Sequence, residues 1–103
     1  MSQFDVYRNL QPTRELFPYL LDLQAEAVSM LETRIVAPLI LRSKFSQPSR
    51  VINPVVSIQG RKYVVLVQEM AGLPKRQLGS AVTNLKEGRA DFIAATDLLL
   101  TGI

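Results

Sequence analysis

The chain has 103 residues, a formal net charge of +3, and no Cys, His or Trp. It therefore has the size of one domain, residues 1–103, and it cannot form a disulfide, a thiolate metal site or a Ser-His-Asp triad. Its 48% apolar and 20% charged residues are typical of a globular protein. The missing side chains favour a protein that acts by binding over an enzyme, and we expect neither a cofactor nor a metal.

Two strands are predicted near the start of the chain. Residues 4–8 alternate apolar and polar side chains, which is the period of a half-buried strand. Residues 9–15 are polar and contain Pro12, as is typical of a loop. Residues 19–24 predict the second strand, which begins directly after Pro18, where a missing N–H matters least.

A third strand is predicted at residues 34–41, with an interruption at Pro38. Proline has no backbone N–H to donate to a neighbouring strand, so Pro38 predicts an edge strand or a bulge. The preceding residues 25–32 leave helix and loop open, because their composition suits a helical turn but the segment is short. The following residues 42–53 are polar and basic, which favours a connecting loop.

A hairpin is predicted next along the chain. Residues 54–58 and 61–69 are rich in β-branched side chains, and only Gln59 and Gly60 separate the two runs. The uninterrupted apolar run at residues 63–67 indicates a central strand that is buried on both faces.

The last third of the chain predicts a helix. Residues 71–74 break the strand pattern, and residues 76–82 are expected to hold one more short extended piece. Asn84 is the predicted N-cap, with Glu87 three residues later completing a capping box, and Gly102 is the predicted left-handed residue at the helix end. One face of this helix carries residues at spacings of three and four, namely Phe92, Ile93, Thr96, Leu99, Leu100 and Ile103.

Together these elements predict a fold that is mainly β with one C-terminal α-helix. Short strands joined by hairpin turns favour a small, mostly antiparallel barrel over a parallel sheet, because parallel strands need long crossover connections. The N-terminus lacks a basic start with an apolar stretch, and no run approaches 18 apolar residues. We therefore expect a cytoplasmic protein with no membrane partner.

Charge is unevenly distributed along the chain. Eight basic residues and one acidic residue lie between Arg34 and Arg76, a balance of +7, whereas the two flanks together carry −4. This basic middle is compatible with an acidic partner, with nucleic acid, or with an ordinary solvated face. The basic residues are scattered and lack interleaved aromatic residues, which disfavours a stacking platform for single-stranded nucleic acid.

Several stretches give the chain a family resemblance that extends over almost its whole length. They occur in the family's order and at nearly its spacing, and they are residues 3–7, 22–24, 34–39, 54–58, 70–74 and 102–103. On these stretches the sequence resembles CcdB, the toxin half of a type II toxin–antitoxin pair that poisons bacterial DNA gyrase.

The resemblance implies an SH3-like barrel with a C-terminal helix, working as a homodimer without catalysis. Such a toxin binds the gyrase A subunit and traps the complex in which both DNA strands are cut, with no direct DNA binding of its own. A cognate, CcdA-like antitoxin with an acidic, disordered tail neutralises it. The basic middle suits that tail, and Arg42, Lys44 and Arg50 are the residues we expect to contact it.

The family's gyrase-binding residues can be carried over position by position. Thr101 stands where the family's best-known member has Trp, a residue that can stack on a guanidinium. Asp97 stands at an Asn position, and the aliphatic pair after the second strand becomes Ala27 and Val28. The expected gyrase-binding set is Thr101, Gly102, Ile103, Leu100, Asp97, Ala27 and Val28.

Two other functions are compatible with the sequence. An RNA-cleaving toxin of the MazF type shares the barrel fold and needs a basic residue and a hydroxyl near the scissile phosphate. Arg14 with Thr13, or Arg34 with Thr33, would be its candidate pairs. The departures at Thr101 and Asp97 also fit a CcdB homologue that has lost toxicity.

Overall fold

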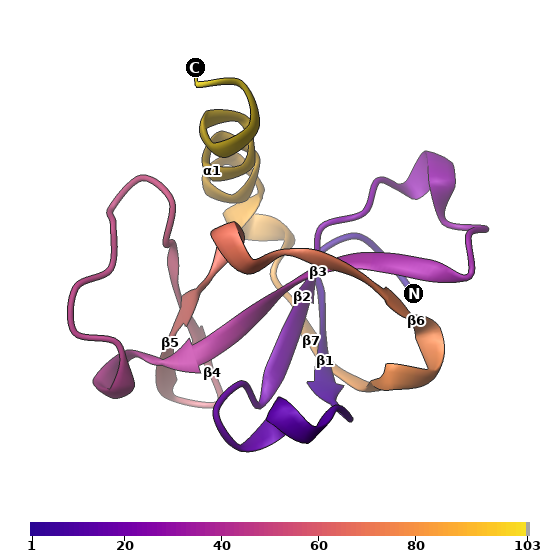
Figure 1. Ribbon diagram of the computed structural model, residues 1–103, viewed down its shortest axis with the longest axis horizontal. Helices are drawn as coiled ribbons and strands as arrows, with labels where there is room; N and C mark the ends of the chain where they lie inside the picture. The colour runs from indigo at the N-terminus through magenta and orange to yellow at the C-terminus, as the bar shows by residue number, and fades with distance from the viewer. Residues whose placement is uncertain (103) are drawn as a thin grey trace.

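Seven β-strands and one α-helix occupy residues 1–102, the part of the chain that the computed structural model describes (Figure 1). Short 3₁₀ turns, labelled η, join several of them. The strands and the helix are β1 (Asp5–Asn9), β2 (Tyr19–Asp22), β3 (Thr33–Leu41), β4 (Val55–Ile58), β5 (Arg61–Val65), β6 (Ala71–Pro74), β7 (Leu78–Asn84) and α1 (Arg89–Thr101).

The strands form one antiparallel sheet in the order β4-β5-β3-β2-β1-β7. The nine-residue strand β3 lies at its centre and pairs with β2 on one side. On its other side the first half of β3 pairs with β6 and the second half with β5. The sheet curls into a half-barrel, and α1 rises from it (Figure 1). The predicted fold class, mainly β with one C-terminal helix, is confirmed.

The main hydrophobic core lies between one face of the curled sheet and the first half of α1. Phe92 and Ala95 are the buried residues of the helix, and the ring centroids of Phe92 and Phe4 are 5.6 Å apart. On the strands, the edge-to-face pair of Tyr19 and Tyr63 belongs to the same core. Each large apolar side chain buried here contributes about 1.5–3 kcal/mol, which is why the helix docks through these two turns.

The opposite face of the sheet holds a buried polar cluster. Asp22 and Arg34 have no exposed side-chain surface, and Arg34 Nη2 lies 2.7 Å from Asp22 Oδ2. The Tyr7 hydroxyl donates to the same oxygen at 2.5 Å, and the backbone N–H of Gln24 donates to Asp22 Oδ1 at 2.9 Å. Burial, and then the hydrogen bond to Asp22, raise the pKa of Tyr7 above its ordinary value of 10.0.

The hairpin prediction is confirmed. Gln59 and Gly60 form the two-residue turn between β4 and β5, with φ of 51° and 82°. Two successive residues with positive φ are typical of a type I′ turn, whose twist matches that of the flanking strands. Residues 63–67 are all buried as predicted, although β5 ends at Val65 and the 3₁₀ turn η4 (Val67–Glu69) follows.

The prediction that Pro38 marks an edge strand or a bulge was wrong, because β3 is the central strand and its register with β2 runs through Pro38 without a shift. Pro38 is tolerated there because its side of β3 is where the partner strand changes from β6 to β5. At that point the Pro38 carbonyl accepts the Leu66 amide, with an N–O distance of 2.9 Å. The missing N–H therefore falls in a break of the strand ladder.

One strand and one helix start differ from the sequence-based expectations, and one expected strand is confirmed with shifted bounds. Residues 71–74 continue the sheet as β6, and the extended piece expected within residues 76–82 is the seven-residue strand β7. Asn84 ends β7 and accepts the Lys86 amide through its side chain at 2.9 Å. It is therefore not the cap of α1, which begins after Gly88 without a side-chain cap.

Candidate partner-binding site at the end of the C-terminal helix

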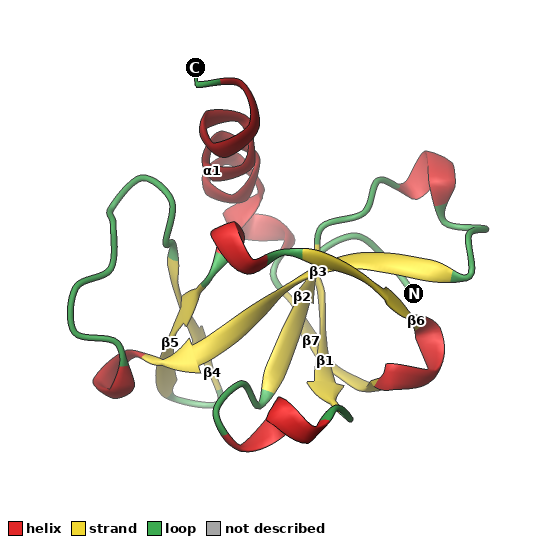
Figure 2. Ribbon diagram, in the orientation of Figure 1, coloured by secondary structure: helices red, strands yellow, loops and turns green. Residues whose placement is uncertain are grey.

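The helix α1 has an anchored half and a projecting half. Its first two turns bury Phe92 and Ala95, and its last turns extend away from the strands (Figure 2). The helix ends as predicted at Gly102, whose φ is 78° and whose amide donates to the Leu98 carbonyl at 2.9 Å. A left-handed residue is cheapest as glycine, so Gly102 sets where the helix stops.

The projecting half presents a run of leucines. Leu98 is half-buried, Leu99 is 37% exposed and Leu100 is 67% exposed. Apolar residues gathered at an exposed helix end are typical of a surface that contacts another protein. The predicted target-binding residue Leu100 thus lies on a free, apolar surface. Ile103, predicted for the same surface, lies outside the described residues.

Asp97 and Thr101 lie on the same projecting half, and both are exposed. The Thr101 hydroxyl donates to the Asp97 carbonyl at 2.6 Å, so its polar group is engaged within the helix itself. A carboxylate in the last turns opposes the helix dipole by about 0.3–1 kcal/mol. Asp97 is therefore not placed for helix stability, and its carboxylate is available to a partner.

The aliphatic pair of the predicted site lies away from the helix end, on the loop between β2 and β3, which is called the η2 lobe below. Ala27 and Val28 belong to the 3₁₀ turn η2 (Glu26–Val28), and both are exposed. The Glu26 carboxylate accepts a hydrogen bond from the backbone N–H of Gln3 at 2.6 Å, which holds this turn against the N-terminal segment. Within residues 1–102 no hydrogen bond or ion pair joins η2 to the last turns of α1. One chain thus presents the predicted site as two separate pieces.

Sequence reasoning missed an apolar extension of the η2 lobe. Met30 is 70% exposed, Leu31 is 49% exposed and Ile35 is 40% exposed, close in the chain to Val28. The signal was present, since residues 25–32 hold apolar side chains without a clear helical or strand period. That segment was interpreted only as an undecided connection, although exposed apolar residues in a loop indicate a contact surface.

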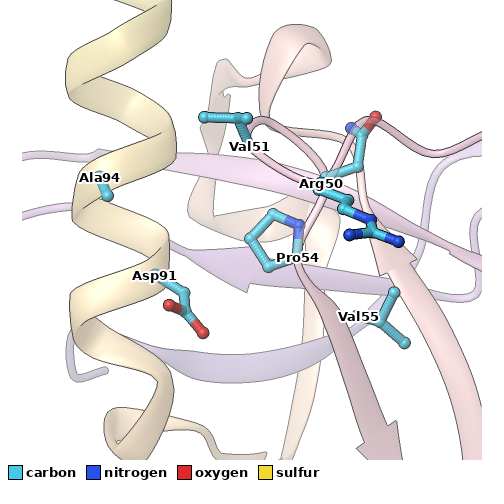
Figure 3. A pocket seen from close by; sticks show the side chains of 7 residues that line it. Arg50, Val51, Pro54, Val55, Asp91 and Ala94 are labelled. Carbon is cyan, nitrogen blue, oxygen red and sulfur yellow. The ribbon is translucent and has the colours of Figure 1, made fainter. Parts of the chain in front are cut away.

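The three basic residues expected to contact the antitoxin do not gather in one place. Arg42 and Lys44 lie on the 3₁₀ turn η3 (Arg42–Lys44), and Arg42 lines an open hollow of about 420 Å³. Arg50 lines a different hollow of about 440 Å³, between residues 50–55 and α1 (Figure 3). Asp91 lies across that second hollow, so the surroundings of Arg50 are of mixed charge.

The residue pairs considered for RNA cleavage have unsuitable surroundings. Arg34 is completely buried against Asp22, so it cannot reach a phosphate on the surface. Arg14 is exposed, but its guanidinium donates to the Gln11 carbonyl at 3.2 Å. The hydroxyl of Thr13 accepts a hydrogen bond from the Asn9 amide group at 3.1 Å.

Comparison with known protein families identifies the family of the chain. In residues 1–102, no helix has both the length and the apolar character needed to cross a membrane. The comparison with curated proteins found no match. The sequence model of the family described as CcdB protein matches residues 3–102, which is nearly the whole chain. This chain therefore belongs to the CcdB family, the toxins of CcdB-type toxin–antitoxin pairs.

Proposed function

We propose that this chain is a toxin that binds the A subunit of DNA gyrase and traps the cleaved gyrase–DNA complex. The observation that carries the proposal is the projecting, apolar end of α1, at the position where the family has its gyrase-binding residues. A protein that binds one state of an enzyme cycle better than the others accumulates that state without any chemistry. The toxin therefore acts as an inhibitor and not as a catalyst, in the cytoplasm.

The proposed contact residues fall into two groups with different roles. Leu100, Thr101 and Gly102 form the tip that enters the gyrase dimer, and Asp97 offers a carboxylate one turn earlier. Ile103 belongs to the same proposed contact set and lies outside the described residues. Ala27 and Val28 provide a second, smaller contact from η2. Because one chain holds these two groups on separate lobes, we also propose a homodimer in which two helix ends lie side by side.

A cognate antitoxin completes the proposal. Its acidic, disordered tail would be attracted by the basic middle of the chain, with Arg42 and Lys44 on η3 as contacts. Arg50 belongs to a separate hollow with Asp91 and is a weaker candidate for an acidic partner. Neutralisation then consists of removing the toxin from gyrase by mass action.

The deciding experiment combines purified protein, gyrase, supercoiled DNA and ATP. We expect linear, cleaved DNA to accumulate at micromolar protein. The variant Leu100→Lys should abolish cleavage, because it places a charge at the centre of the apolar tip. The control Leu16→Lys changes another exposed leucine, 48% exposed against 67% for Leu100, on a different part of the surface and should cleave as the wild type does.

Two further measurements make the outcome specific. Thr101→Trp should raise potency by about 2- to 30-fold, since a Trp on a guanidinium contributes roughly 0.5–2 kcal/mol. Normal supercoiling and no linear DNA with the wild-type protein would contradict gyrase poisoning. In that case, normal growth of a sensitive bacterium during strong induced expression would support a homologue without toxicity.

A further inference from the structure

A hollow with only basic charges lies at the end of the β3–β5 strand pair. It has a volume of about 420 Å³ and is lined by Leu41, Arg42, Ser43, Arg61 and Lys62. Arg61 and Lys62 were not singled out as a site by the sequence, because they are far from Arg42 along the chain. The fold brings the three cations to one opening.

Strand register explains why these cations meet. Leu41 pairs with Tyr63 in the antiparallel β3–β5 ladder, so the next residues outward, Arg42 and Lys62, lie beside each other. Arg61 follows the type I′ turn of Gln59 and Gly60, which begins β5 at this end of the sheet. The three side chains are therefore held by ladder and turn rather than by a long loop.

Among the described residues, Arg42, Arg61 and Lys62 form no ion pair with an acidic side chain. Within residues 1–102 the contact of Asp22 with Arg34 is the only ion pair, and no acidic residue lines the hollow. Arg42 donates to the Phe45 carbonyl at 2.9 Å, and Lys62 donates to the Ser57 hydroxyl at 2.8 Å. An arginine has five N–H donors and a lysine has three, so most of their donor capacity remains free.

We propose that this hollow binds paired carboxylate side chains of an acidic, extended polypeptide segment, with Arg42, Arg61 and Lys62 as the contacts. The proposal rests on the proposed function, in which an acidic antitoxin is the partner, and it assigns that partner a docking point. Guanidinium groups bind carboxylates through two parallel hydrogen bonds, and a lysine adds a compact charge. Single-stranded nucleic acid is disfavoured because no aromatic residue lines the hollow.

The test measures binding of a fluorescein-labelled peptide of alternating Glu and Gly by fluorescence anisotropy at low salt. We expect Arg61→Gln/Lys62→Gln to weaken binding about tenfold, because the contacts of two exposed charges with the peptide are lost together. The matched control Arg14→Gln/Arg76→Gln removes the same charge from exposed positions elsewhere and should weaken binding less than about twofold. Circular dichroism checks that both variants are folded.

Two outcomes of these binding measurements would overturn the proposal. Equal weakening in the two variants would mean that net charge alone attracts the peptide, and it would overturn the site. Tighter binding of a labelled single-stranded oligonucleotide, with loss in Arg61→Gln/Lys62→Gln, would overturn the choice of an acidic polypeptide. A peptide with Gln in place of Glu should not bind.

The outcome is separable from gyrase poisoning. Arg61 and Lys62 are not among the residues proposed to contact gyrase, so Arg61→Gln/Lys62→Gln should still produce linear DNA in the cleavage assay. Failure of the wild-type protein in that assay would contradict the proposed function while peptide binding remained intact. Failure of peptide binding with normal DNA cleavage would contradict the docking site alone.

Discussion

Asp22 and Arg34 form an ion pair from which water is fully excluded. Removing each of these charges from water costs several kcal/mol. The pair is stable only because additional hydrogen bonds to its members offset this desolvation cost. Asp22 receives donors from Tyr7 and Gln24 in addition to Arg34. Arg34 is only partly satisfied: within residues 1–102 its Nε atom donates to Asp22, whereas its Nη1 and Nη2 atoms have no hydrogen-bond partner, although Nη2 lies 2.7 Å from Asp22 Oδ2. The cluster therefore depends on every member being present.

The first prediction concerns removal of one partner. Arg34→Met should lower the free energy of unfolding by about 3–5 kcal/mol, because it leaves the Asp22 carboxylate buried without its cation. Urea unfolding followed by circular dichroism measures this loss. The control Arg76→Met, at an exposed position, should change stability by less than about 0.5 kcal/mol.

A double variant keeps this prediction decisive if Arg34→Met does not fold. Asp22→Asn/Arg34→Met removes both charges. The Asn side chain keeps one oxygen for the backbone N–H of Gln24, and its NH2 group can donate to the Tyr7 hydroxyl oxygen in place of the lost acceptor. The double variant should be more stable than Arg34→Met alone, since no unpaired charge stays buried. A double variant that is less stable than the single one would show that packing, and not the charge, determines the cost.

The second prediction is a pH dependence. The raised pKa of Tyr7 means that the unfolded chain loses this proton near pH 10 while the folded chain still holds it. The stabilisation is therefore complete below pH 10 and is lost as pH rises. Between pH 10 and 11 the advantage of the wild type over Tyr7→Phe in unfolding free energy should shrink by about 1 kcal/mol. A constant difference across urea titrations at pH 8, 10 and 11 would contradict it.

At the scale of single elements, the sequence predicted correctly those turns and helix ends whose conformation depends only on residues adjacent in the chain. The β4–β5 hairpin and the helix end at Gly102 follow from positive-φ residues in the chain itself. The strand β6 did not, because Ala71 to Pro74 has weak strand propensity and is extended only by pairing with the first half of β3. The prediction for Pro38 failed for the same reason. The gap in strand pairing beside Pro38 lies between β6 and β5, two strands from later in the sequence.

The third prediction concerns the start of α1. A Cβ at Gly88 would lie 2.7 Å from the Phe92 Cζ atom, and the Phe92 ring is buried against Phe4. Gly88→Ala should therefore cost about 1–3 kcal/mol, because the ring that anchors the helix has to move. At Gly72 the same Cβ would lie 3.5 Å from Ile35 Cδ1, which is ordinary contact. Gly72→Ala is thus the matched control, and equal urea midpoints for the two variants would exclude the anchoring role.

At the scale of the whole molecule, the sequence predicted candidate site residues but not how the fold groups them. Arg42, Lys44 and Arg50 are close in the chain, yet Arg50 lies in another hollow with Asp91. Arg42 instead joins Arg61 and Lys62 from β5. Such groupings depend on strand register and curl, which composition and spacing do not specify. The exposed leucines of α1 could be named from the helical pattern, but their projection beyond the sheet could not.

The last prediction links assembly to function. Leu99 is 37% exposed at the projecting end of α1, where the proposed dimer places two helices together. Leu99→Lys should convert a dimer into a monomer in sedimentation analysis, because it would bring two like charges into an apolar contact, where removing each charge from water costs several kcal/mol. Lysine is a good helix former and is favoured near a helix C-terminus, so the helix itself should persist. The control Leu16→Lys should remain dimeric, and the monomeric variant should lose gyrase poisoning although the tip residue Leu100 is intact. A Leu99→Lys protein that stays dimeric would place the interface elsewhere, with the exposed Met30 and Leu31 lobe as the next surface to test.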